Sequence, residues 1–367
     1  MKFTPFKMAF YGQDWNTTGA INMHSSNPEP FSWQELQTLT ELEFQQVLRD
    51  VSLGYESTQG HLGVRQALCS SYYPSLDVGN IALTSGAQEG IFLIANSLIE
   101  AGDEVVTFTP CFQPLVSVFA DAGAQVKQLA LDAADNWSIP WDKLLQAVTV
   151  KTKLLVINFP HNPTGATISD SELNRLIELC RENDCWLFSD EVFRGLEHDN
   201  TRLPAVAEHY YKGISMGVMS KSMALPGIRL GWLATKNPQL IQQCLNVKSQ
   251  ISICQSSLDA AVTEKLLPAS HLIWQRNNEI IHRNKALVSK WLTNNEGFHA
   301  VMSKASATLF VQCKEASESA ETFCHNLLKD KGIFTMPSPA FLTDQQGFRL
   351  TLGKRNADSL YEAIFTI

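Results

Sequence analysis

The sequence lacks a basic excess and a long apolar segment, and each absence excludes a class of protein. The formal net charge is −8 at pH 7, whereas a nucleic-acid-binding protein needs a basic face. No block of like charge forms a polybasic membrane patch, and no run approaches the roughly 18 apolar residues of a membrane span. Because the N-terminus also lacks a signal-peptide pattern, we expect a cytoplasmic protein without nucleic-acid or membrane partners.

A cysteine cluster is also lacking. The eight cysteines are scattered, with no CxxC pair and no Cys/His cluster. Zinc sites need closely spaced ligands, and disulfide frameworks belong mainly to small secreted chains. We therefore expect buried thiols and no metal. The 367 residues, 44% of them hydrophobic and 18% charged, have the balance and length of a globular protein with a large core.

Short apolar runs alternate with helical patterns through the middle of the chain. Strand-like runs occupy residues 80–85, 104–110, 124–131, 153–160, 185–191 and 211–220. One intervening helix begins with a capping box, Ser169 followed by Glu172. Such alternation implies right-handed crossovers and an α/β fold with a mostly parallel sheet covered on both faces.

The pattern changes near residue 270. A long amphipathic helix is predicted over 270–292, followed by strand-like, helical and strand-like runs at 307–313, 321–332 and 347–353. This order indicates a smaller α+β unit. We predict an N-terminal segment (1–30) that packs with the small domain, a large domain (31–269) and a small C-terminal domain (270–367).

Four polar residues closely follow predicted strands, namely Ser85, Asn162, Asp190 and Lys221. Ligands bind beyond the carboxyl ends of the strands in such sheets, so these residues are expected around one crevice. Lys221 stands in the largely apolar stretch 217–234, with only Arg229 as a second charge. A buried ammonium is unfavourable unless it is paired, neutralised or used.

Each motif has a plainer explanation when it is taken alone. TSGAQEG (84–90) and NPTG (162–165) could be simple turns, and SDE (189–191) a strand end with a solvated acidic pair. Lys221 could extend its ammonium to water, and Arg229 could pair with any carboxylate. The order of the motifs is harder to explain as coincidence.

Taken in order, TSGAQEG, PCF, HNPTG, SDEVF, SK…PGIRLGW and FRLTLG resemble the class I/II, fold type I aminotransferases that depend on pyridoxal 5′-phosphate. The resemblance extends from about residue 20 to 353. It implies a large domain with a mostly parallel seven-stranded sheet flanked by helices, plus a small α+β domain. It also implies an aminotransferase (EC 2.6.1.-) that exchanges an amino group between an amino acid and a 2-oxo acid through pyridoxamine phosphate.

The resemblance assigns the central chemistry to Lys221 and Asp190. Lys221 matches the lysine that holds the cofactor aldehyde as a Schiff base; desolvation favours its neutral, nucleophilic form, and the freed amine can shuttle the substrate proton. Asp190 matches the carboxylate that faces the pyridine nitrogen and keeps it protonated. We expect that partner to lower the pKa of Asp190. A helix-capping role is the simpler alternative for Asp190.

The cofactor phosphate needs donors of hydrogen bonds. Gly86 and Ala87 begin a helix, whose N–H groups and dipole suit a dianion, and Ser85 precedes them. Ser220 and Arg229 resemble further phosphate ligands, because arginine can bind two oxygens at once.

Four more residues match positions of the family that contact cofactor or substrate. Phe112 matches the aromatic that stacks on the cofactor ring, and Asn162 the donor to its phenolic oxygen. Arg349 matches the arginine that binds the substrate α-carboxylate, unless it is a solvent-facing strand residue. Tyr55 matches the tyrosine that reaches the partner subunit's phosphate, which implies a homodimer with shared active sites; ordinary packing is its alternative.

Phe193 departs from the family pattern, which is usually DEVY rather than DEVF. The tyrosine hydroxyl that would contact the phenolic oxygen is therefore absent, and Asn162 alone is expected to stabilise the phenolate. The Schiff base should then keep its proton to a higher pH than in relatives with tyrosine. Val218 also stands where many relatives have a phosphate-binding Ser or Thr.

The N-terminal stretch NMHSSNPEPFSWQEL lacks the usual glycine before its proline-rich turn. It is more similar to the start of capreomycidine synthase-like proteins, which act on a hydroxylated arginine. The alternative activity is therefore a lyase or cyclase on an arginine-like amino acid. A sensor module would require an additional DNA-binding domain, and a dinucleotide-binding oxidoreductase a GxGxxG after the first strand.

Overall fold

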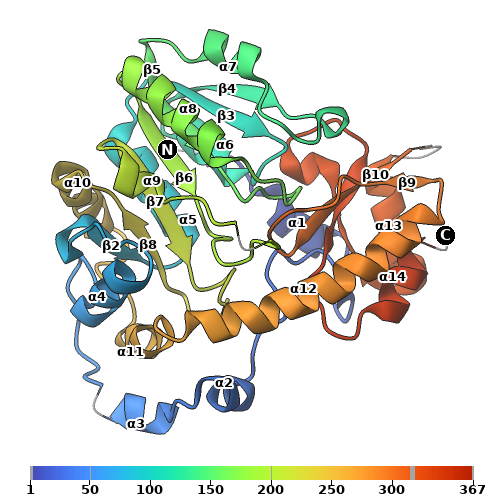
Figure 1. Cartoon of the computed structure of the whole chain (residues 1–367), viewed down its shortest axis with the longest axis horizontal. Helices are drawn as coiled ribbons and strands as arrows, with labels where there is room; N and C mark the ends of the chain where they lie inside the picture. The colour runs from blue at the N-terminus through green and yellow to red at the C-terminus, as the bar shows by residue number, and fades with distance from the viewer. Residues whose placement is uncertain (1–2, 50, 200, 315–318, 366–367) are drawn as a thin grey trace.

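The computed structural model describes residues 3–49, 51–199, 201–314 and 319–365. Its large domain is built on a seven-stranded sheet in the order β2-β8-β7-β6-β5-β3-β4 (Figure 1). The strands are β2 (Ile81–Thr84), β3 (Glu104–Thr109), β4 (Gln125–Ala130), β5 (Thr152–Ile157), β6 (Trp186–Asp190), β7 (Gly213–Val218) and β8 (Gly231–Ala234). Every strand pair except those made by β8 is parallel. The predicted fold class is confirmed.

The strands bury side chains on both faces of the sheet because neighbouring residues point in opposite directions. On β3, Val105 belongs to one hydrophobic core and Val106 to another. On β5, Leu154 and Leu155 divide in the same way. The continuous apolar runs of the sequence therefore reflect a sheet covered on both sides.

Two sets of helices cover the sheet. Apolar residues of α5 (Ala87–Leu98), α6 (Pro114–Asp121) and α10 (Pro238–Lys248) join the core on one face. Those of α7 (Trp141–Ala147), α8 (Asp170–Glu182) and α9 (Val206–His209) join the core on the other face. The capping box predicted at Ser169 and Glu172 begins α8.

Strand β8 was not recognised in the sequence. It is antiparallel to both neighbours, β2 and β7. The connection from β7 to β8 contains Lys221, and the pairing of Gly231 with Thr84 returns the chain to the start of α5. This reversal places the lysine and the glycine-containing turn at one edge of the sheet.

The small domain has a four-stranded antiparallel sheet in the order β12-β13-β10-β9. Its elements are α12 (Ser270–Thr293), β9 (Phe298–His299), β10 (Thr308–Cys313), α13 (Ala320–Lys331), β11 (Ile333–Phe334), β12 (Met336–Pro337), β13 (Gly347–Thr351) and α14 (Asp358–Phe365). The long helix α12 runs along the lower side of the molecule toward this domain (Figure 1).

Part of the N-terminal segment lies against the small domain, whereas residues 3–7 contact α5 and α6 of the large domain or the residues just before α6. Strand β1 (Ile21–Asn22) pairs with β11, and the amide of Thr351 donates to the carbonyl of Met23. The helix α1 (Lys7–Asp14) precedes it, and α2 (Trp33–Thr40), α3 (Phe44–Arg49), α4 (Leu62–Ser71) and α11 (Ser257–Leu266) complete the fold. The exact domain boundaries stay a prediction.

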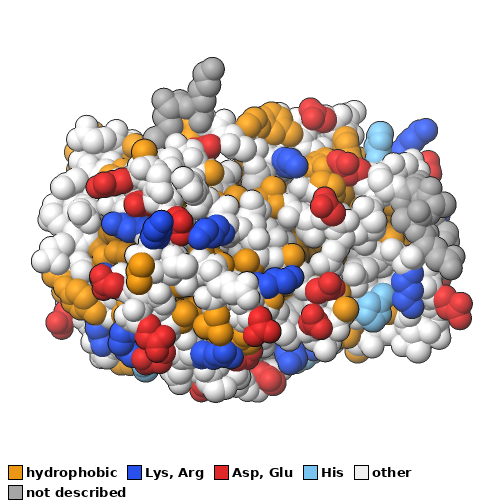
Figure 2. Space-filling view, turned by 90° about the horizontal axis from the view of Figure 1, so that it is seen from above, with side chains coloured by type: hydrophobic (Ala, Val, Ile, Leu, Met, Phe, Trp, Pro, Cys, Tyr) orange, Lys and Arg blue, Asp and Glu red, His pale blue; other side chains and the backbone are white. Residues whose placement is uncertain are grey.

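Acidic and basic side chains are interspersed over the face shown in Figure 2. Within the described ranges, no helix is both long and apolar enough to cross a membrane.

Candidate active site

Four of the predicted residues lie at one edge of the large sheet. Asp190 ends β6, Asn162 follows β5, Lys221 follows β7 and Ser85 follows β2. These four strands run in one direction. Strand β8 is antiparallel to both β7 and β2, so β7 and β2 are parallel to each other. Their carboxyl ends therefore share one edge, as the sequence analysis expected.

Lys221 has a lowered pKa and a partner from the N-terminal segment. Its Nζ donates to Oγ of Ser26 at 2.6 Å. Burial, together with the charges of Arg349 and Arg229, lowers the lysine pKa to about 8, although Asp190 opposes this shift. The direction of this shift is the one expected from the sequence, because burial makes the protonated amine less favourable.

Asp190 is a buried carboxyl that is 4% exposed. One of its oxygens accepts a hydrogen bond of 3.2 Å from the amide of Val192. Burial raises its pKa to about 7, and the Val192 amide and Lys221 only partly offset this effect. The lowered pKa expected from the sequence depended on a protonated ring nitrogen as partner; for the protein groups alone, burial outweighs the favourable contacts and the pKa is raised.

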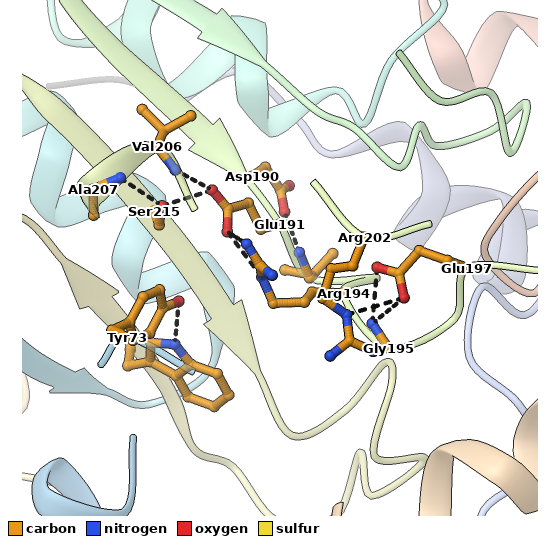
Figure 3. Close-up of polar contacts among 12 residues, drawn as sticks. Tyr73, Asp190, Glu191, Arg194, Gly195, Glu197, Arg202, Val206, Ala207 and Ser215 are labelled. Carbon is orange, nitrogen blue, oxygen red and sulfur yellow. Dashed lines mark hydrogen bonds and ion pairs between the residues drawn. The ribbon is translucent and has the colours of Figure 1, made fainter. Parts of the chain in front are cut away.

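A buried ionic network begins at Glu191, the residue after Asp190 (Figure 3). The carboxylate of the next residue, Glu191, accepts from Oγ of Ser215 at 2.6 Å and from the amide of Val206 at 3.1 Å. It also pairs with Arg194, with 3.2 Å between Nη2 and Oε2. These contacts fix the chain just after Asp190, and therefore the direction of its carboxyl group.

Arg349 and Asn162 are in direct contact. Nη1 of Arg349 donates to Oδ1 of Asn162 at 2.9 Å, and Nε and Nη2 donate to the carbonyl of His24 at 2.9 and 2.6 Å. Arg349 is 3% exposed, which excludes the solvent-facing alternative, and burial lowers its pKa to about 9. Because Arg349 donates to Oδ1, the side-chain amide of Asn162 is oriented, and its Nδ2 can donate to another acceptor.

Asn158 is a site residue that no sequence motif predicted. Its Nδ2 donates to the carbonyl of Asp190 at 2.9 Å, and its Oδ1 accepts from the amide of Asn162 at 2.9 Å. Asn158 thereby joins the ends of β5 and β6. Its place directly after an apolar strand was an available signal. For His24 and Ser26 the sequence contained no comparable signal, because their contacts are made across the fold.

The turn before α5 forms an anion-binding cradle. Gly86 has φ of +81°, and a Cβ at this position would lie 2.8 Å from Nη2 of Arg229. Ser85 and Ala87 flank this glycine and are partly exposed; Ser220, which precedes Lys221 in the chain, is partly exposed as well. A glycine, a helix N-terminus and an approaching guanidinium suit a phosphate, so the residues present fit the expected cofactor.

The aromatic residues occupy different environments. Phe112 is half-buried and receives Phe6 edge-on, with ring centroids 5.4 Å apart. Phe193 is fully buried in the hydrophobic core. Tyr55 is 88% exposed and projects from the surface. The single chain therefore leaves Tyr55 outside the cluster formed around Lys221.

Comparisons with known proteins agree with this geometry. The chain is 25% identical to an arginine–pyruvate transaminase of Pseudomonas aeruginosa over 302 residues, covering 78% of this chain and 74% of the relative. It is 28% identical to a capreomycidine synthase of Streptomyces vinaceus over 267 residues, covering 72% and 68%. A PLP-dependent aminotransferase from Streptococcus suis superposes with a TM-score of 0.91 and 26% identity, covering 100% of this chain and 96% of that one.

The sequence model for "Aminotransferase class I and II" matches residues 21–364. This match includes the sheet, the cradle before α5, the lysine turn and the small-domain arginine. The chain therefore belongs to the class I and II aminotransferases, and it is an enzyme that uses pyridoxal 5′-phosphate.

Proposed function

We propose that this aminotransferase moves an amino group between an amino acid and a 2-oxo acid, with Lys221 holding the cofactor as a Schiff base. The observation that carries the proposal is the environment of Lys221, whose pKa is lowered to about 8 beside Asp190 and Arg349. When bound, pyridoxal phosphate supplies an electron-withdrawing ring and an aldehyde that accepts the amino group.

The residues divide the work by their position. Asp190 would bind the pyridine nitrogen, Phe112 would stack on the ring, and Asn162 would donate to the phenolic oxygen. Arg349 would bind the substrate carboxylate, and its contact with Asn162 would align the two sites. Nζ of Lys221 would take the proton from the substrate Cα, because a lysine with a pKa of about 8 is partly neutral at physiological pH.

The phosphate would lie in the cradle before α5. Gly86 and Ala87 would donate backbone N–H groups, and Ser85, Ser220 and Arg229 would add side-chain donors. Phe193 would pack beside the cofactor without a hydroxyl to offer.

We also propose a homodimer in which Tyr55 reaches the partner subunit's phosphate. Its 88% exposure is high for a tyrosine, and other large apolar side chains are exposed as well, namely Leu53, Ile251, Ile253 and Leu258. Sedimentation equilibrium tests this proposal, and a monomer at micromolar concentration would contradict it. The acidic net charge argues against nucleic-acid or membrane partners. We propose a cytoplasmic enzyme, because the scattered cysteines suit a reducing compartment.

The cyclase or lyase activity on an arginine-like amino acid is the second candidate. It is favoured by the similarity to capreomycidine synthase and by the contact of Ser26 with Lys221, since Ser26 belongs to the N-terminal stretch that lacks the usual glycine. Mixing the enzyme with single amino acids separates the two activities. Accumulation of pyridoxamine phosphate supports transamination, whereas ammonia or a cyclised product without it supports the alternative.

The covalent link has a direct test. Borohydride reduction of the holoenzyme followed by peptide mass mapping should place the pyridoxyl group on Lys221. A modified peptide that lacks residue 221, or a colourless holoenzyme, would contradict the proposal.

A further inference from the structure

A carboxylate lies in the same helical turn that is proposed to bind the cofactor phosphate. Glu89 is in the first turn of α5, and its Oε2 accepts a hydrogen bond from the amide of Ser85. The helix N-terminus and Arg229 favour a dianion at this turn. An unpaired carboxylate so close to it would repel that dianion.

Lys248, the last residue of α10, neutralises this carboxylate. Its side chain is completely buried, and Nζ lies 3.0 and 3.3 Å from the two oxygens of Glu89. Nζ also donates to Oγ of Ser252 at 2.8 Å, and that hydroxyl donates to Glu89. The three side chains form one closed hydrogen-bonded cluster.

The backbone holds this cluster in place. The carbonyl of Lys248 accepts the amides of Ile251, Ser252 and Ile253, each at 3.1 Å. Ser252 is therefore fixed relative to the lysine, and the lysine relative to α5. A buried pair that keeps its partners is tolerated, whereas removing one partner leaves an uncompensated charge.

We propose that Lys248 is a positioning residue for the cofactor phosphate, which it serves by neutralising Glu89 and by fixing the Ser85–Gly86 turn. The inference rests on the proposed phosphate site. It also assigns the amide of Ser85 to Glu89, so that Ser85 offers the phosphate its hydroxyl while Gly86 and Ala87 offer their amides.

Binding of pyridoxal phosphate and of pyridoxal, which lacks the phosphate, tests this role in the apo-protein. We expect Lys248→Met to weaken pyridoxal phosphate binding about tenfold or more and to leave pyridoxal binding within about twofold. Glu89→Gln keeps an acceptor for the Ser85 amide. Adding it to Lys248→Met removes the repulsion and should restore pyridoxal phosphate affinity to within about threefold of wild type.

Equal losses for both ligands in Lys248→Met, or no recovery in the double variant, would overturn the inference. Lys127→Met is the control. Lys127 lies on β4, the outer strand at the other end of the sheet from β2, and pairs with Glu104 at 2.7 Å. This variant should change neither affinity. If Lys248→Met does not fold, Ser252→Ala carries the same test with an expected loss of about two- to fivefold for pyridoxal phosphate alone.

The outcome for wild-type protein separates this inference from the proposed function. A wild-type apo-protein that binds pyridoxal phosphate no better than pyridoxal contradicts the phosphate site itself. A wild-type protein with a clear phosphate preference that Lys248→Met retains contradicts only the role of Lys248.

Discussion

Nζ of Lys221 donates a 2.6 Å hydrogen bond to Oγ of Ser26, 195 residues earlier in the chain. The N-terminal segment that contains Ser26 also supplies the His24 carbonyl to Arg349. One short segment therefore contacts both the lysine proposed to hold the cofactor and the arginine proposed to hold the substrate. Its sequence is positioned to affect what the enzyme does with the substrate after Cα is deprotonated.

Replacing Ser26 by alanine should slow catalysis. The change removes the hydroxyl that orients Lys221, and we expect kcat to fall about three- to tenfold with little change in cofactor binding. Steady-state kinetics and cofactor titration measure the two effects. Ser25→Ala is the control, since the hydroxyl of Ser25 bonds Oδ1 of Asn27 at 2.8 Å instead; an equal loss in both variants would argue against a specific role.

The reaction of apo-protein with pyridoxal phosphate should depend on pH through Lys221. Only the neutral amine attacks an aldehyde, and burial lowers the pKa of this lysine to about 8. The rate should therefore rise with pH and reach half its maximum near pH 8. Stopped-flow absorbance measures it, and a midpoint near the ordinary lysine value of about 10.4 would refute the burial argument.

Replacing Asp190 by asparagine should stabilise the apo-protein at alkaline pH while impairing activity. The pKa of Asp190 is raised to about 7 by burial, so its contribution to stability is present below pH 4 and is lost as pH rises through 7. At pH 8 we expect the free energy of unfolding of Asp190→Asn to exceed that of wild type by about 2–4 kcal/mol. Denaturant unfolding at pH 4.5 and pH 8 should show that the difference in free energy of unfolding between variant and wild type grows with pH. A difference that stays constant would contradict this account.

Replacing Arg349 by lysine should raise KM for the amino acid about 10- to 100-fold. The planar guanidinium contacts Asn162 and His24 and still has N–H groups for a substrate carboxylate. A lysine ammonium cannot reproduce this geometry. Cofactor affinity should change little. Initial rates over a substrate series measure the effect, and an unchanged KM would remove Arg349 from the substrate site.

Replacing Phe193 by tyrosine should lower the pKa of the Schiff base. The added hydroxyl can donate to the phenolic oxygen and stabilise the phenolate. The Schiff base then loses its proton at a lower pH. Spectrophotometric pH titration of the holoenzyme measures the shift. Because Phe193 is fully buried, circular dichroism must show an intact fold, and a folded variant that titrates no lower than wild type would refute the expectation.

The alternation of strands and helices could be read from the sequence because hydrophobic periodicity is a property of neighbouring residues. The predicted strands at 153–160 and 185–191 correspond to β5 and β6, and the predicted helix at 270–292 corresponds to α12. Strand β8 (Gly231–Ala234) was missed although it is as long as the recognised β2, because its antiparallel place is set by contacts with β2 and β7.

The sequence by itself determined the α/β class, the motif order and the residue types suited to pyridoxal phosphate, including Lys221 and Arg349. Only the tertiary structure decided that Ser26 contacts Lys221, that Asn158 joins Asp190 to Asn162, and that Lys248 neutralises Glu89. The physical reason is that each of these contacts joins residues on separate elements. Their distance depends on strand order and helix packing, which no local pattern of side chains encodes.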